Sequence, residues 1–348
     1  MAAFEVTAVD LGLRLGLYQH LRGTFLRGSE LAVRAQVDER YAREWLEQQA
    51  VSGVVECDVA GAAPELRRYR LPEEHARCLL DVEDPLYMAP FVAFGRLFSD
   101  PLPELAEAYR TGAGVPYARY GLHEAQGAQN RPALVHELAG WLAAVPGLHE
   151  RLERPGARAL EVGCGVGWAC IAMAEAFPQL RVEGLDIDQD SIALARQIAD
   201  ERGVGERVTF TLADVADVGA FEGGHGLESG LDLVLAVEML HDLSRPVAAL
   251  AGMRRLVTAA GGDPGVVLVI DENVRDAFTA PADELERAFY AFSVLHCLPV
   301  GLAEQPSAAT GTVLRPGVLR GYASEAGFAE VVHVDLGNGF FRGYRLIA

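Results

Sequence analysis

The sequence contains no lysine, and all 30 of its basic residues are arginines. So complete a bias indicates a coding preference rather than a functional choice. Acidic residues outnumber the arginines, 49 to 30, and give a formal net charge of −19. Nucleic acids and anionic membranes repel a chain of this charge, so neither is expected as its main partner. A local basic patch is not excluded by this argument.

Long apolar runs are missing as well. Half of the residues are hydrophobic, which is ample for a buried core, but no run reaches the length of about eighteen apolar residues that spans a membrane. The first residues, MAAFEVTAVDLG, lack the basic region and the small-residue cleavage site of a secretion signal. We therefore expect a cytoplasmic protein without a membrane partner.

Cysteines are few and scattered. The five of them show no CxxC motif and no Cys/His spacing typical of zinc sites. Buried structural thiols in a reducing compartment are the expectation, and no metal site is predicted.

The first 82 residues are predicted to form short helices followed by a hairpin. Apolar residues recur at helical spacing over residues 6–21, and further helices are expected at 29–35 and 38–53. Two strands, at 53–58 and 67–72, flank a loop rich in Ala, Gly and Pro. Three helices followed by a two-stranded wing form the winged-helix pattern.

A winged helix raises the possibility of DNA binding, but the charges favour another role. The first 80 residues hold ten arginines and twelve acidic residues. The expected recognition helix carries Asp38, Glu39, Glu44 and Glu47 on a surface that would have to face phosphates. We favour a dimerisation domain, giving a homodimer in which the apolar first helix is the interlocking element.

Residues 83–155 are expected to form a helical linker with one irregular insert at 110–132. This Gly- and Pro-rich insert carries Tyr117 and Tyr120. A loop with aromatic residues at a domain junction is a natural lid over a substrate pocket. Ordinary anchoring of the loop by aromatic packing explains the same residues equally well.

From residue 156 to residue 348 the pattern alternates between strand and helix. Seven strands are predicted, with a GNG turn signal between the last two. Their ranges are 157–163, 181–187, 207–214, 231–238, 265–272, 331–336 and 340–346. Alternating βα units with a closing antiparallel hairpin predict an α/β fold, a doubly wound and mostly parallel Rossmann-like sheet.

A glycine-rich loop, "EVGCGVG", follows the first of these strands. The dinucleotide-binding fingerprint GxGxxG needs a third glycine three residues after the second. Counted from Gly163 that place holds Trp168, and counted from Gly165 it holds Cys170. The loop therefore favours a ligand without a pyrophosphate, and Glu161 supplies an acid beside it.

Acidic residues also end the next two strands. Asp186 can accept the two hydroxyls of a ribose, and Asp214 can accept an adenine amino hydrogen. Together with the glycines, this set resembles the class I S-adenosylmethionine-dependent methyltransferases over residues 156–348. With the winged helix included, the whole chain resembles their small-molecule O-methyltransferase branch. A longer turn at 257–265, where the family has a compact one, is the main departure.

The resemblance implies S-adenosyl-L-methionine as the cofactor and assigns residues to it. The glycines would line the methionine part, Asp186 the ribose and Ile187 the adenine face. Asp214 would lie at the adenine amino group, and Glu238 would line the cofactor or substrate cavity or form part of its wall. Glu161 and Val215 are further cofactor-binding candidates. The cofactor-binding residues so implied are Glu161, Gly163, Gly165, Gly167, Asp186, Ile187, Asp214, Val215 and Glu238.

The resemblance also implies catalytic and substrate residues. His241, in "EMLHDL", would be the general base, because a hydroxyl must lose its proton as the methyl group arrives. Glu272 would orient it, with Asp271 competing for that position, although His241 could instead cap a helix or contact the cofactor. Tyr117, Tyr120, Asp242 and His296 are the substrate-side candidates, and packing of an aromatic-rich helix is the alternative explanation for His296 and Cys297.

These expectations describe an enzyme that methylates a small-molecule acceptor, at a hydroxyl in the first instance. The acceptor atom could instead be nitrogen, sulfur or carbon. A hypothesis from another class is a transcriptional regulator that uses the winged helix on DNA and the second domain as a sensor of S-adenosylmethionine.

Overall fold

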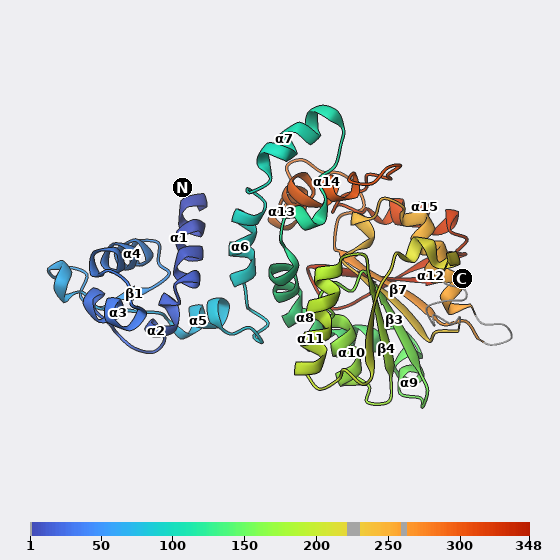
Figure 1. Ribbon diagram of the computed structural model, residues 1–348, viewed down its shortest axis with the longest axis horizontal. Coiled ribbons are helices and arrows are strands. Elements are labelled where there is room, and N and C mark those ends of the chain that lie inside the picture. The colour runs from blue at the N-terminus through green and yellow to red at the C-terminus, as the bar shows by residue number, and fades with distance from the viewer. Residues whose placement is uncertain (1, 221–229, 259–262) are drawn as a thin grey trace. The chain divides into compact units, whose positions relative to one another are not determined.

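The computed structural model describes residues 2–220, 230–258 and 263–348 (Figure 1). The chain divides into two compact units. The first comprises Met1–Asp100 together with Ala128–Pro132, and the second comprises Pro101–Gly127 together with Ala133–Ala348. The expected linker at 83–155 is thus shared between the two units. Residues 259–262 of the long turn lie outside the described residues.

The first unit is a helical domain with a small wing. Its helices are α1 (Ala2–Arg14), α2 (Leu17–Leu21), α3 (Gly28–Ala35), α4 (Glu39–Val51), α5 (Glu73–Leu80) and α6 (Ala89–Leu97). Strands β1 (Glu56–Cys57) and β2 (Tyr69–Arg70) pair antiparallel to form the wing. Asp38 caps α4 by accepting the backbone N–H groups of Arg40 and Tyr41. The predicted order of helices and hairpin is confirmed.

The second unit is built on one seven-stranded sheet, in the order β5-β4-β3-β6-β7-β9-β8. Its strands are β3 (Arg158–Val162), β4 (Arg181–Asp186), β5 (Val208–Leu212), β6 (Leu233–Val237), β7 (Val266–Glu272), β8 (Glu330–Val334) and β9 (Phe341–Ile347). The strands from β3 to β7 pair parallel, whereas β9 pairs antiparallel with both β7 and β8. The predicted fold class, with its closing hairpin, is confirmed.

Helices cover both faces of this sheet (Figure 1). Along β6, Leu233 and Leu235 belong to the core that contains residues of α8 (His123–Ala143), α10 (Trp168–Ala176) and α11 (Gln189–Glu201). The intervening Val234 and Ala236 belong to the opposite core, with residues of α12 (Pro246–Val257) and α15 (Pro316–Glu325). Both faces of the central strands are therefore buried, which explains their nearly continuous hydrophobic sequences.

The remaining α-helices of the second unit are α7 (Leu102–Thr111), α9 (Leu148–Leu152), α13 (Glu284–Phe292) and α14 (Leu298–Gly301). Leu148 and Leu152 of α9 belong to the same core as the residues of α8 and α10. A π-helical segment, η5 (Ser293–Cys297), connects α13 with α14. None of the helices in the described part of the chain has both the length and the hydrophobicity needed to span a membrane.

Candidate functional site

The glycine loop leaves β3 at the carboxyl edge of the sheet, where ligands bind in this class of fold. Gly163, Gly165 and Gly167 all have positive φ, at 65°, 50° and 84°. A Cβ on Gly163 would lie 2.8 Å from Cε of Met239, so a side chain is excluded there by packing as well as by conformation. At Gly165, by contrast, nothing lies within 4 Å of the Cβ position. The backbone at Gly165 therefore borders open space that a ligand can fill.

Glu161 faces the interior instead of the open side of the loop. It is 3% exposed, and its Oε2 accepts the Cys170 backbone N–H at 3.0 Å and the Cys170 thiol at 3.0 Å. Burial raises the pKa of Glu161 to about 8, so its carboxyl group is mostly protonated at neutral pH. The structure therefore gives Glu161 a role in holding the start of α10 beneath the loop.

Asp186, at the end of β4, ties the loop to its neighbour strand. Its Oδ2 accepts the Gly165 N–H at 2.7 Å and its Oδ1 accepts the Asp188 N–H at 2.9 Å. Burial raises the pKa of Asp186 although these backbone hydrogen bonds oppose the shift. The next residue, Ile187, is 65% exposed. A half-buried acid followed by an exposed apolar side chain matches a ribose with a flat base beside it.

Asp214 and Val215 follow β5. Oδ2 of Asp214 lies 2.5 Å from the Arg245 guanidinium, and Oδ1 accepts the Ala216 N–H at 2.7 Å. Val215 is buried. Arg245 also pairs with Asp217, so this end of the site is a charged network rather than a lone carboxylate. Sequence reasoning missed Arg245, because the ion pair joins residues 31 positions apart.

Glu238, directly after β6, has a left-handed backbone conformation with φ at 48°. This conformation is uncommon for a residue with a side chain and costs about 1–3 kcal/mol. The Glu238 N–H still donates to the Ile270 carbonyl at 2.9 Å, so the strained residue is held in place from β7. Strain at this position turns the chain toward the short 3-10 helix η4 (Leu240–Asp242).

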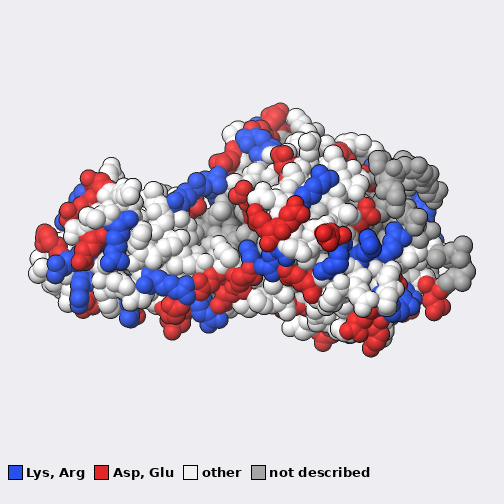
Figure 2. Space-filling model, turned by 60° about the horizontal axis from the view of Figure 1, so that its bottom comes forward, with Lys and Arg blue, Asp and Glu red and all other residues white. Residues whose placement is uncertain are grey.

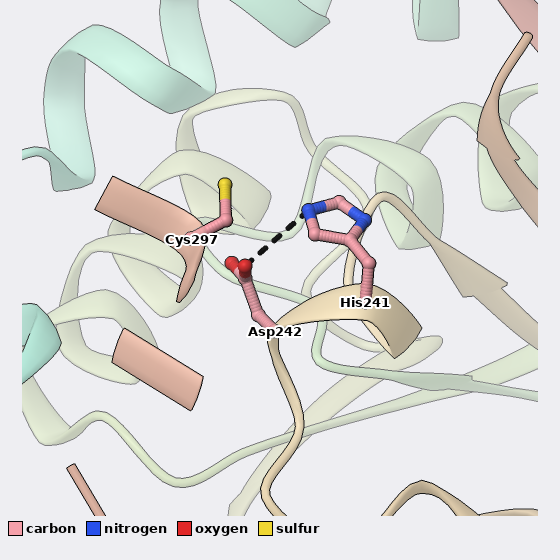
Figure 3. Close-up of side chains that lie close together, drawn as sticks. All are labelled: His241, Asp242 and Cys297. Atoms are coloured by element: carbon pink, nitrogen blue, oxygen red, sulfur yellow. Dashed lines mark ion pairs between the residues drawn. The ribbon is translucent and has the colours of Figure 1, made fainter. Parts of the chain in front are cut away.

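His241, in η4, is 2% exposed and lies among three carboxylates. Its Nδ1 is 2.8 Å from Asp271 Oδ1 and 3.1 Å from Glu272 Oε2, both at the end of β7. On the other side of the ring, Nε2 is 3.3 Å from Asp242 Oδ1. Figure 3 shows this ring edge facing the Asp242 carboxylate, with Cys297 beside it. Both acids expected to compete for the histidine therefore contact it.

The charges around His241 shift its pKa and those of the two acids at its Nδ1 side. Burial alone lowers the pKa of His241, but the carboxylates of Glu272, Asp271 and Asp242 together raise it well above its usual value. Burial raises the pKa of Asp271, yet the His241 charge and hydrogen bonds bring it below its usual value. Burial raises the pKa of Glu272 far above its usual value. Asp271 is thus the ionised partner of the imidazole, whereas burial disfavours the charged form of Glu272.

The structure brings the expected substrate-side residues together beside η4. The rings of Tyr120 and Tyr117 lie edge-on to His296, with centroids 4.7 and 5.8 Å away. Tyr120 donates its hydroxyl to the Leu295 carbonyl at 2.9 Å, and burial lowers the pKa of His296 to about 4. Burial raises the pKa of Tyr117, and the charges of Asp186, Asp188 and Asp242 add to the effect. Tyr117 therefore lies between the two acidic ends of the site.

Two contacts of this cluster have no sequence signal. Gln126 accepts the Tyr117 hydroxyl at 2.8 Å. His123, whose ring centroid is 5.3 Å from that of Tyr117, places Nδ1 3.0 Å from Asp188 Oδ2. Both residues lie in the insert that precedes the sheet, so only folding brings them to the strand ends.

Comparison with protein families finds two matches. Residues 153–291 match the model of a methyltransferase domain. Residues 3–80 match the model of an Rv2258c-like winged HTH domain. The first segment contains the glycine loop and strands β3 to β7 of the second unit, and the second contains α2 to α5, most of α1 and the wing of the first unit.

Curated relatives match a shorter stretch. Norajmaline N-methyltransferase of Rauvolfia serpentina is 28% identical over 109 residues, which are 31% of this chain and 34% of the relative. A ubiquinone biosynthesis O-methyltransferase of Xanthomonas axonopodis pv. citri is 32% identical over 111 residues, 32% of this chain and 43% of the relative. The matched part thus spans less than half the length of either relative.

Among solved structures, human N-acetylserotonin methyltransferase in complex with SAM resembles the whole chain. The TM-score is 0.70 with 15% sequence identity, covering 99% of this chain and 94% of that structure. At this identity the similarity shows a shared fold that includes both units.

Proposed function

Because the chain carries a methyltransferase domain preceded by an Rv2258c-like winged HTH domain, we propose that it transfers a methyl group from S-adenosyl-L-methionine to the hydroxyl of a small molecule. The observation that carries the proposal is the buried His241–Asp271 pair beside the glycine loop, at 2.8 Å. The residues that would bind a nucleoside and the proposed proton acceptor therefore lie at the same edge of one sheet, at the carboxyl ends of its parallel strands.

The residues at the carboxyl ends of β3 and β4 fit the cofactor. The open space at Gly165, the half-buried carboxyl group of Asp186 and the exposed side chain of Ile187 match a methionine part, a ribose and an adenine in that order. When bound, S-adenosylmethionine supplies a methyl group on a positively charged sulfur. An ionised Asp186 carboxylate at this edge of the sheet favours that charge.

His241 accepts the proton of the acceptor hydroxyl through Nε2. Asp271 fixes the ring by accepting from Nδ1, which leaves the Nε2 edge facing Asp242 and the substrate side. The raised pKa of His241 brings it nearer to that of a phenol, which makes the neutral imidazole a stronger base. The neutral form must be populated first, so the rate rises with pH through the raised pKa.

Tyr117, Tyr120 and His296 favour an aromatic acceptor. Their rings meet edge to face, and the lowered pKa of His296 keeps its imidazole uncharged at neutral pH. A wall of this kind binds a flat, uncharged ring by packing and leaves the polar contact to Asp242 and His241.

The test is methyl transfer to a panel of phenolic and aliphatic alcohols, with amines and thiols as the alternative acceptors, read as a mass gain in the product. His241→Ala is expected to lower kcat about 10²-fold or more, with little change in the affinity for S-adenosylhomocysteine. His333→Gln, at an exposed histidine on β8, is the matched control. Undiminished turnover in H241A would refute the role of His241 as general base. Transfer to amines alone would refute the hydroxyl as the acceptor group.

The first unit supports a homodimer better than a DNA contact. Its α1 exposes Phe4 and Leu11 at 79% and 49%, and Leu15, directly after the helix, is 45% exposed. Arginines of this unit pair with nearby acids, in the pairs Arg22–Asp81, Arg40–Glu44, Arg67–Glu47, Arg68–Asp58 and Arg70–Glu56. Figure 2 shows acidic and basic side chains interspersed over the face it draws. Arginines already paired are poor phosphate ligands, so we propose a homodimer without a nucleic-acid partner. The cytoplasmic location expected from the sequence is part of this proposal.

A further inference from the structure

Three side chains from distant parts of the chain surround one point in the second unit. A ring nitrogen of His241, a carboxylate oxygen of Asp242 and Sγ of Cys297 all lie within 4.8 Å of one another. His241 and Cys297 are 2% and 7% exposed. Figure 3 shows the three side chains converging, with His241 and Asp242 coming from η4 and Cys297 from the end of η5.

This donor set suits zinc. Thiolate, imidazole and carboxylate bind Zn²⁺ at about 2.3, 2.0 and 2.0–2.2 Å in tetrahedral geometry, which places neighbouring donor atoms about 3.4 Å apart. Nε2 of His241 and Oδ1 of Asp242 are already 3.3 Å apart. The Cys297 sulfur lies within 4.8 Å of both atoms, so bringing it to the same spacing takes a shift of about 1.4 Å or less, within reach of a rotation about one side-chain bond.

The orientation of His241 is that of a metal-bound histidine. Zinc-binding imidazoles donate their second ring nitrogen to a carboxylate, which fixes the ring and strengthens the metal bond. Here Nδ1 lies 2.8 Å from Asp271 Oδ1. That carboxylate oxygen also accepts the Glu272 backbone N–H at 3.0 Å, so the second shell is itself held in place.

The contact between His241 and Asp242 leaves a place for a cation between its two atoms whenever the imidazole is neutral. In that form, with the Nδ1 proton directed at Asp271, the lone pair of Nε2 points toward Oδ1 of Asp242. That oxygen is buried and has no hydrogen-bond partner. Two electron-rich atoms 3.3 Å apart repel each other unless a proton or a metal ion lies between them.

The backbone brings the cysteine to this point. Single π-helical turns such as η5 occur often at functional sites. A few residues later, the Cβ position of Gly301 lies 3.3 Å from the Asp242 carbonyl oxygen. A larger residue at Gly301 would push α14 away from η4, so the glycine keeps the two segments in contact.

We propose that His241, Asp242 and Cys297 form a three-ligand site for Zn²⁺ with a fourth position left for water. On binding, the Cys297 thiol releases its proton to solvent and its sulfur becomes the third ligand. The geometry of the site does not depend on which acceptor is methylated. Its consequence for the proposed reaction, which rests on the proposed function, is inhibition, because the ion takes the Nε2 lone pair that would accept the hydroxyl proton.

The test uses Co²⁺ as a spectroscopic substitute for zinc, added to full-length protein after treatment with a chelator and without cofactor. The expected result is one ion per chain, with intense tetrahedral visible bands and a near-ultraviolet charge-transfer band from the cysteine sulfur. Added Zn²⁺ is expected to displace the cobalt and remove both sets of bands.

Variants assign the bands to the three residues. Cys297→Ser is expected to lose the charge-transfer band, and Asp242→Asn is expected to weaken binding at least tenfold while keeping that band. Cys78→Ser, at a partly exposed thiol of the first unit, is the matched control and keeps it. Absence of the band in the wild-type protein overturns the proposal, and so does a band that persists in C297S. Binding of S-adenosylhomocysteine is measured without metal, so a failed metal site leaves the proposed function untouched.

Discussion

Burial of Glu161 predicts a stability that depends on pH in a specific way. Its pKa is raised to about 8 in the folded protein, against about 4.3 for an exposed glutamate. Between these values the folded state holds one proton more than the unfolded state, so the free energy of unfolding falls by about 1.4 kcal/mol for each pH unit as the pH rises. The Glu161→Gln variant keeps an acceptor for the Cys170 N–H and removes the titration.

The stability difference between E161Q and the wild type is therefore expected to grow in favour of E161Q, by about 2.5 kcal/mol between pH 5.5 and 7.5. For a unit of this size that corresponds to a change of roughly 5–10 °C in the difference between the two Tm values. Thermal unfolding followed by circular dichroism at several pH values measures it. Glu201→Gln, at an exposed carboxylate of α11, controls for the loss of one negative charge. A difference between E161Q and wild type that stays constant with pH would refute the reasoning.

Other predictions concern the loop, the base and the dimer. Gly163→Ala should lower Tm more than Gly156→Ala. Both glycines have positive φ, at 65° and 82°, but only at Gly163 does a Cβ also meet a methionine side chain. Equal losses of stability, near the ~1–2 kcal/mol of left-handed strain alone, would contradict this. Asp271→Asn removes a negative charge that raises the pKa of His241, so the rise of kcat with pH should move to lower pH, and an unmoved profile argues against the pair. Phe4→Glu, at a residue 79% exposed, should give monomers in analytical ultracentrifugation, and an unchanged dimer would place the interface elsewhere.

The sequence alone predicts the sheet well because its signals are local. Each strand is a short apolar run ended by glycine or an acid, and the alternation with helices leaves few topologies. The glycine spacing of the loop likewise separates it from a dinucleotide fold. Asp38, as the cap of α4, is another local signal that the structure confirms.

Side-chain direction and distant contacts are beyond such signals. Glu161 lies next to the loop in sequence, but the pleat of β3 turns it toward Cys170. The alternative between Asp271 and Glu272 had no answer in the sequence, because both reach the same nitrogen of His241. Cys297 comes beside His241 only through the packing of α14 on η4, which no motif spacing records.

Isothermal titration calorimetry with S-adenosylhomocysteine and, separately, NAD⁺ tests the central claim most directly, that the glycine loop and Asp186 hold a sulfonium nucleoside rather than a dinucleotide. The account predicts micromolar binding of S-adenosylhomocysteine to the wild-type protein, its loss in Asp186→Ala with the fold intact by circular dichroism, and no binding of NAD⁺. Binding of NAD⁺ in place of S-adenosylhomocysteine, or undiminished affinity in D186A, would contradict it.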